Sequence, residues 1–141
     1  MVIRFAYTYG MKEKFVQGGV DPFAQYHARH PDASASLVLP VTEGLPAGIV
    51  VSGVLDSDTA PDFFEGAVEA LSELSSGAEL ELRLEGVRFI SSTGVGALTR
   101  LLAEAQGRGI AMRISGVSPA CEDVFSVLGL LRYFNIPGVE S

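Results

Sequence analysis

Three consecutive hydroxyl side chains stand where a predicted strand ends and a predicted helix begins. The strand ends at Ile90, Ser91, Ser92 and Thr93 follow, and Gly94 precedes an apolar helical face. Free backbone N–H groups and the helix dipole favour an anion at such a position. We expect Ser92 or Thr93 to cap the helix, since hydroxyl residues are preferred caps. The same geometry would accommodate a phosphoryl group on a hydroxyl, which makes a modification site the second interpretation.

The glycines of this segment do not form a nucleotide-binding loop. No Gly-Lys-Ser or Gly-Lys-Thr occurs here, and the spacing of Gly94 and Gly96 is wrong for a dinucleotide fingerprint. Both glycines would instead let a partner's loop approach the backbone closely.

Other candidate sites are weaker, and we predict no catalytic residue, no metal and no cofactor. His27 and His30 form an H-x-x-H pair without an evident third ligand, so ordinary surface histidines are the preferred interpretation. Cys121 has no general base nearby in the sequence and is expected to be structural. Paired carboxylates or a nucleophile–base pair at convincing spacing are not found, so the sequence does not favour an enzyme.

The elements that position the hydroxyl cluster predict an α/β domain. We expect strands over 37–42, 49–55, 80–90 and 110–114, with helices over 60–75, 95–105 and 119–128. The apolar face of the last helix is predicted to consist of Val124, Phe125, Val127 and Leu128. Helical crossovers imply parallel strands, whereas the first two strands form an antiparallel edge hairpin in which Pro40 marks the edge. The predicted fold is a mixed β-sheet with helices packed against it.

Residues 1–35 are predicted to be an N-terminal extension, and residues 36–141 the main domain. The extension could contain a strand over 2–9 and a short helix that begins near Asp21 and ends before Pro31. Three roles stay open for it: an added strand at the sheet edge, dimerisation, or partial disorder.

Composition excludes several classes of function. The 141 residues carry a net charge of -7, which would repel nucleic acid. A single cysteine points to a reducing compartment, and no signal peptide or membrane span is evident, so we expect a cytoplasmic domain without membrane insertion. Residues 37–141 contain 6 arginines, no lysine and 14 acidic residues. This acidic surface either aids solubility or fits a basic protein partner.

Five sequence segments in order resemble the STAS domain, a family named after sulphate transporters and anti-sigma factor antagonists. They are Gly53–Asp56 (GVLD) with Thr59–Pro61 (TAP), Leu84–Ile90 (LEGVRFI), Ser92–Leu98 (STGVGAL), Arg113–Pro119 (RISGVSP) and Val124–Ile136 (VFSVLGLLRYFNI). The resemblance covers about residues 36–137 and implies the STAS fold.

The resemblance implies a regulatory protein that switches partners. In antagonists of this family, an anti-sigma factor that is also a serine kinase phosphorylates a serine at this helix start, and a PP2C-type phosphatase restores binding. On this sequence the phosphoacceptor is Ser92, with Thr93 and Ser91 as alternatives. Phosphate there would repel acidic partner groups and block close packing. The predicted partner-binding residues are Asp56, Ser91, Ser92, Thr93, Gly94 and Val95.

One departure from the family pattern opens an alternative. Ser91 stands where the family usually has an aspartate, and Asp56 has a turn or cap role as its second interpretation. Some small STAS proteins bind the cytoplasmic ATPase of lipid-transport ABC systems, so a transport subunit is the alternative function. A homodimer is a further open arrangement.

Overall fold

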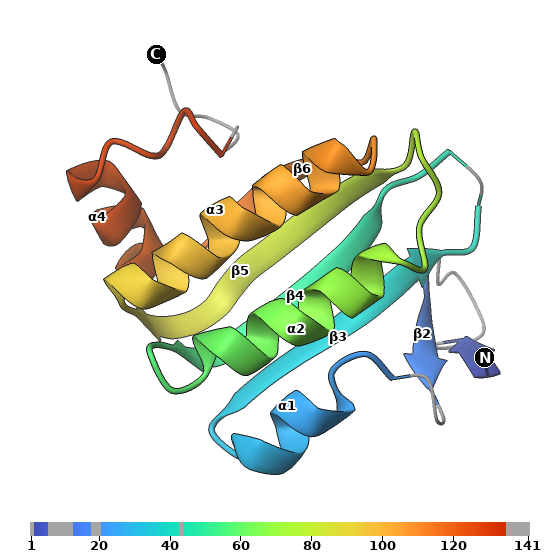
Figure 1. The fold of residues 1–141 in the computed structure, drawn as a ribbon, viewed down its shortest axis with the longest axis horizontal. Coiled ribbons are helices and arrows are strands. Elements are labelled where there is room, and N and C mark those ends of the chain that lie inside the picture. The colour runs from blue at the N-terminus through green and yellow to red at the C-terminus, as the bar shows by residue number, and fades with distance from the viewer. Residues whose placement is uncertain (1, 6–12, 18–20, 43, 135–141) are drawn as a thin grey trace.

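The computed structural model describes residues 2–5, 13–17, 21–42 and 44–134. Within them a mixed six-stranded sheet has its strands in sequence order (Figure 1). The strands are β1 (Val2–Phe5), β2 (Glu13–Gln17), β3 (Ala33–Pro40), β4 (Ala47–Leu55), β5 (Glu79–Ile90) and β6 (Ala111–Val117). The helices are α1 (Ala24–Arg29), α2 (Ala60–Leu71), α3 (Ser92–Gly107) and α4 (Pro119–Val127). The predicted fold class is therefore confirmed.

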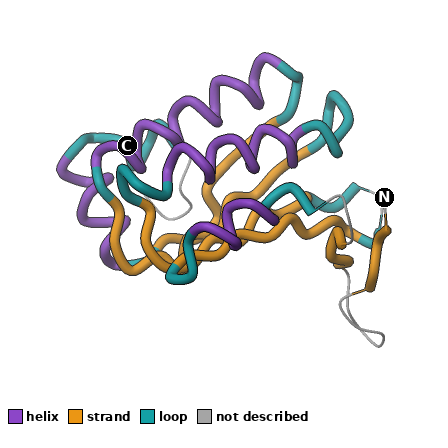
Figure 2. Tube along the Cα trace, turned by 60° about the horizontal axis from the view of Figure 1, so that its bottom comes forward, coloured by secondary structure: helices purple, strands orange, loops and turns teal. Residues whose placement is uncertain are grey.

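The sheet changes direction at its middle. Strands β1 to β4 pair antiparallel, whereas β4, β5 and β6 pair parallel. Helical connections α2 and α3 link the parallel strands, as the crossover rule requires. Both helices lie side by side over one face of the sheet (Figures 1 and 2).

Pro40 does not mark a sheet edge, which corrects the prediction for the strand at 37–42. Strand β2, which we did not predict, pairs with β3, and Glu13 lies opposite Pro40. Because Pro40 is the last residue of β3, its missing N–H removes little of the pairing. Of the strand predicted over 2–9, Val2–Phe5 forms β1 and residues 6–9 lie outside the described residues.

The core lies between the sheet and the helices. Alternation along β5 buries Leu80, Leu82 and Leu84 on the helix side. Helix α2 begins with Pro61 in its first turn and presents a stripe of buried residues at helical spacing. This stripe consists of Phe63, Gly66, Ala67, Ala70 and Leu71. The helix predicted over 60–75 ends at Leu71 and continues as turns to Leu74.

Helix α1 is docked firmly on α2 and β3. The ring of Phe23 stacks on Phe63 at 6.0 Å, and Tyr26 meets the same ring edge-on at 6.0 Å. Gly66 makes room for this contact, because a Cβ there would lie 2.7 Å from the Phe23 ring. The short helix predicted in the N-terminal extension is thus present, and it ends at Arg29, before Pro31, as expected.

Polar contacts of α1 complete the docking. His30 Nε2 lies 2.8 Å from Asp62 Oδ2, and Arg29 donates to Asp62 Oδ1 at 3.2 Å. The hydrogen bond with His30 is the main reason that the pKa of the Asp62 carboxyl is lowered. His27 accepts a hydrogen bond from the Ala35 N–H at 3.1 Å. Both histidines therefore hold α1 in place.

Helix α4 is attached by only part of the apolar face that we predicted for it. Cys121 and Phe125 are fully buried, and Phe125 packs against Phe134 at 5.2 Å. Val127 and Leu128, expected on the same buried face, are 86% and 50% exposed. They lie at the end of α4, as its last residue and its C-cap, and the apolar face predicted there is not buried.

Candidate functional site

Ser91 caps α3, which corrects the expectation that Ser92 or Thr93 does so. Ser91 has an extended backbone, with φ −97° and ψ 173°, and its Oγ accepts a hydrogen bond from the Gly94 N–H at 3.2 Å. Its carbonyl accepts from the Val95 N–H at 2.9 Å and so begins the helical ladder. The helix therefore starts at Ser92 and uses the hydroxyl one residue earlier as its cap.

The start of α3 is pressed against the end of β4. The Ser91 N–H donates to the Leu55 carbonyl at 3.0 Å. A Cβ on Gly94 would lie only 2.3 Å from that same carbonyl oxygen. Gly94 therefore serves an internal contact, whereas we had expected it to admit a partner's loop. Gly96 keeps an open approach, because no atom of the described residues lies within 4 Å of the position that a Cβ would take.

Asp56 shapes the loop that precedes α2. Its Oδ1 accepts from the N–H groups of Asp58 at 3.0 Å and Thr59 at 3.1 Å. The Thr59 hydroxyl accepts from the Asp56 N–H at 2.9 Å and donates to the Val54 carbonyl at 3.0 Å. Asp56 thus has the turn role that we considered as its second interpretation. Thr59 stands at the cap position of α2 but makes no side-chain cap.

The predicted partner-binding residues gather at this one end of the sheet, with very different exposure. Leu55, which precedes Asp56, touches both Ser91 and Gly94, so the β4–α2 loop and the α3 start are neighbours. Ser92 and Thr93 are exposed, and Asp56 and Ser91 are half-buried. Gly94 and Val95 are buried. The hydroxyls free to meet a partner are those of Ser92 and Thr93.

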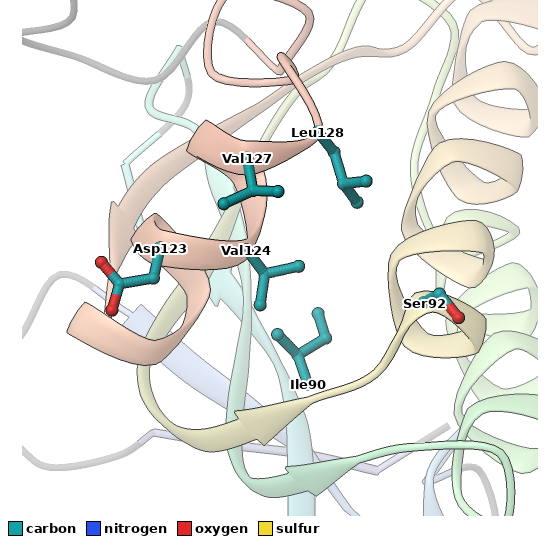
Figure 3. A pocket seen from close by; sticks show the side chains of 6 residues that line it. All are labelled: Ile90, Ser92, Asp123, Val124, Val127 and Leu128. Atoms are coloured by element: carbon teal, nitrogen blue, oxygen red, sulfur yellow. The ribbon is translucent and has the colours of Figure 1, made fainter.

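An apolar groove of about 320 Å³ lies beside Ser92, between the α3 start and α4 (Figure 3). Its lining consists of Ile90, Ser92, Asp123, Val124, Val127 and Leu128. Figure 3 shows the four apolar side chains facing the groove, with the Ser92 hydroxyl and the Asp123 carboxylate pointing outward on opposite sides. The surface beside the hydroxyl cluster is therefore apolar with an acidic rim.

Cys121 is a structural residue. The Cys121 side chain is buried on the inner face of α4. Its backbone N–H donates to the hydroxyl of Ser118, which caps this helix, at 3.2 Å. Burial raises the pKa of the Cys121 thiol, which disfavours the reactive thiolate. Within the described residues no group of three or more histidine, cysteine or acidic side chains could hold a metal ion. No helix in the same part of the chain is long and apolar enough to cross a membrane.

The chain combines a mixed sheet, helical crossovers and a hydroxyl-rich helix start, and comparison with known proteins identifies the family that shares this arrangement. The family model described as "Mlab, STAS domain" matches residues 41–136. The chain therefore belongs to the STAS domain family.

Solved structures share the fold at low sequence identity. An anti-sigma factor antagonist from Mycobacterium paratuberculosis superposes with a TM-score of 0.62 at 20% identity, over 77% of this chain and 89% of that one. The anti-sigma factor antagonist SpoIIAA in its unphosphorylated form gives 0.56 at 22% identity, over 73% and 87%. A sulfate transporter family protein from Wolinella succinogenes gives 0.52 at 23% identity, over 62% and 70%.

Sequence reasoning located the hydroxyl cluster but missed the groove. The groove depends on where α4 lies relative to α3, and periodicity alone placed Val127 and Leu128 on the apolar face of their helix. One signal was present in the sequence. Gly129 ends the helix two residues after Val127, so Val127 and Leu128 lie at the end of the helix rather than in its middle.

Proposed function

We propose that this protein is a cytoplasmic regulatory domain that binds an anti-sigma factor with serine kinase activity and is switched by phosphorylation of Ser92. The partner binds the end of the sheet where the α3 start meets the β4–α2 loop. The exposed Ser92 and Thr93, with the half-buried Asp56 and Ser91, supply its contacts. Gly94 and Val95 support this surface from beneath. The protein regulates by binding and has no catalytic role, and a PP2C-type phosphatase reverses the modification.

The observation that carries the proposal is that two neighbouring serines differ: Ser91 caps α3, and Ser92 is exposed. Ser91 Oγ is engaged as the cap of α3 through Gly94. Ser92 is exposed and sits in the first turn, where free N–H groups and the helix dipole favour a phosphoryl group. A kinase can therefore modify Ser92 without removing the cap.

Phosphorylation would act through charge and bulk. The phosphoryl group adds about two negative charges at a surface with no lysine after Lys14. It would repel acidic groups of the partner and hold the two surfaces apart. A change of this kind at an interface alters affinity by about 2–5 kcal/mol.

Affinity capture from the source cells, followed by peptide mass spectrometry of residues 91–93, tests this function. We expect an anti-sigma kinase in the captured fraction and phosphate on Ser92. The purified kinase should bind the wild type and Ser92→Ala but not Ser92→Asp. Ser75→Asp is the matched control, because this exposed serine lies near the opposite end of β5. Equal binding of Ser92→Asp and wild type would refute the switch.

The alternative function is a STAS subunit of a lipid ABC transport complex that binds the cytoplasmic ATPase. The neutral Ser91 favours it, because the hydroxyl provides the cap without the negative charge of the usual aspartate. Co-purification with the ATPase of a membrane complex, with Ser92 unmodified, is the expected result for this alternative.

A further inference from the structure

The groove between the α3 start and α4 exposes apolar side chains to solvent. Val127 is 86% exposed and Leu128 50% exposed, side by side at the end of α4. The half-buried Val124 and the buried Ile90 complete a continuous apolar surface with them. Adjacent exposed apolar side chains around a hollow mark a place where another molecule binds.

Helix α4 is attached to the rest of the domain by the buried side chains on its inner face. Cys121 and Phe125 are fully buried on its inner side, and Phe134 packs on Phe125 from the following segment. The Leu130 N–H donates to the Phe125 carbonyl at 2.8 Å, which closes the chain back onto the helix. Val127 and Leu128 therefore lie outside the hydrophobic core cluster of the described residues and outside the residues that pack against it.

The charge at the rim indicates what kind of molecule fits. Asp123 is the charged residue among those that line the groove, and its carboxylate points outward at the α4 side (Figure 3). Glu122, next to it on α4, is also exposed. A binding segment that combines an apolar side chain with a neighbouring lysine or arginine satisfies both features.

We propose that this groove receives an apolar side chain from a basic amphipathic helix of the protein partner, with Asp123 pairing to a lysine or arginine on that helix. This inference rests on the proposed function, because the groove adjoins Ser92 and extends the same binding surface. Helix-in-groove docking suits a hollow of about 320 Å³ that is apolar inside and acidic at the rim.

The groove also explains how a modification at Ser92 would act on a basic partner. Ser92 lines the groove on the side opposite Asp123, so a helix that fills the groove would pass beside Ser92 (Figure 3). A phosphoryl group there carries a tightly held hydration shell, which the apolar side chain would have to displace. Bulk and hydration therefore oppose docking even where the partner is basic.

The first test needs no identified partner. The ¹⁵N-labelled protein is titrated with a synthetic 15-residue helical peptide of leucine and lysine, and separately with its leucine and glutamate counterpart. We expect the lysine peptide to shift the amide signals of Ser92, Val124 and Leu128, and the glutamate peptide to leave them unchanged. Shifts confined to the acidic outer face of α2, at Glu65 and Glu69, would overturn the proposal. Binding of a lipid or detergent in the groove in preference to the peptide would also overturn it.

The second test uses the purified partner kinase with three variants of the groove and its control, and with Ser92→Asp for comparison. Val127→Asp and Asp123→Lys should each weaken binding at least tenfold. Val41→Asp is the matched control, because Val41 is 43% exposed and follows Pro40 at the opposite end of the sheet. Val127 is almost fully exposed, so its variant should keep the wild-type unfolding temperature.

The two proposals fail in different ways in this comparison. If Ser92→Asp releases the partner but Val127→Asp and Asp123→Lys do not, the groove proposal is wrong and the switch stands. If the groove variants release the partner and Ser92→Asp does not, the switch is wrong and the groove stands.

Discussion

Helix α1 packs on α2 and β3, whereas α4 packs on β5 and β6, and the two helices use their apolar residues in opposite ways. In α1 and the residue before it, Phe23 and Tyr26 are 0% and 1% exposed, and His30 and Arg29 close the joint on Asp62. In α4 the last turn leaves Val127 and Leu128 in solvent beside a groove. The α1 side is therefore built for stability, and the α4 side keeps apolar area available for binding.

The largest change in stability is expected from a substitution at the α1 side. Replacing Phe23 by Ala removes a fully buried ring that stacks on Phe63, and should lower the free energy of unfolding by about 3–5 kcal/mol. Val127→Ala, at the α4 side, should change the free energy of unfolding by less than about 0.5 kcal/mol. Urea denaturation followed by circular dichroism measures both. Similar losses for the two variants would show that the two helices do not differ in this way.

The second effect sharpens the role of the α3 start. Gly94→Ala places a Cβ 2.3 Å from the Leu55 carbonyl oxygen and should cost about 1–3 kcal/mol, because the backbone must shift. Gly96→Ala is the matched control in the same helix. Its Cβ has open space, so the change should stabilise the protein by about 0.5–1 kcal/mol. Thermal unfolding of the two variants should therefore move in opposite directions.

The third effect separates the two serines. Ser91→Ala removes the side-chain cap of α3 and should destabilise by about 1 kcal/mol, whereas Ser92→Ala should leave the unfolding temperature nearly unchanged. Ser91→Asp should keep the stability, because aspartate caps as well as serine does. It also restores the charge that the family usually carries there. A larger loss for Ser92→Ala than for Ser91→Ala would contradict the assignment of the cap.

The smallest change in stability is expected from the polar contacts of α1 with Asp62. The pKa of Asp62 is lowered in the folded protein, chiefly by His30, so its contribution is complete above its ordinary value of 3.8. The contribution is lost as the pH falls through the lowered folded pKa. Unfolding temperatures between pH 7 and pH 3 should therefore fall less steeply for Asp62→Asn than for the wild type. Identical slopes would show that this contact does not contribute.

The α1 side also contains a buried hydroxyl that is poorly satisfied. Within the described residues Tyr26 Oη has no hydrogen-bond partner, and burial raises the pKa of Tyr26 to about 12. The Thr59 side chain faces it and opposes this shift, but the Thr59 hydroxyl is already engaged with Val54 and Asp56. The aromatic packing of the ring is thus what keeps Tyr26 in the core.

Much of the fold could be predicted from local patterns. The alternation of Leu80, Leu82 and Leu84 predicted β5, and the helical spacing from Phe63 to Leu71 predicted α2. Strand β2 was missed, because a five-residue strand (EKFVQ) with three polar side chains has no clear alternation. The division into residues 1–35 and 36–141 stays a prediction. Helix α1, within the proposed extension, nevertheless contributes Tyr26 to the common core.

Apart from β2, the sequence by itself determined the order of strands and helices and the hydroxyl cluster at the start of α3, since periodicity and turn residues act over a few neighbours. Only the tertiary structure decided which serine caps and which is free, because that depends on Leu55, which is distant in sequence and presses on Ser91 and Gly94. It also decided that Val127 and Leu128 stay exposed beside Ser92. An apolar side chain is buried only where another element covers it, and no local pattern states where that element lies.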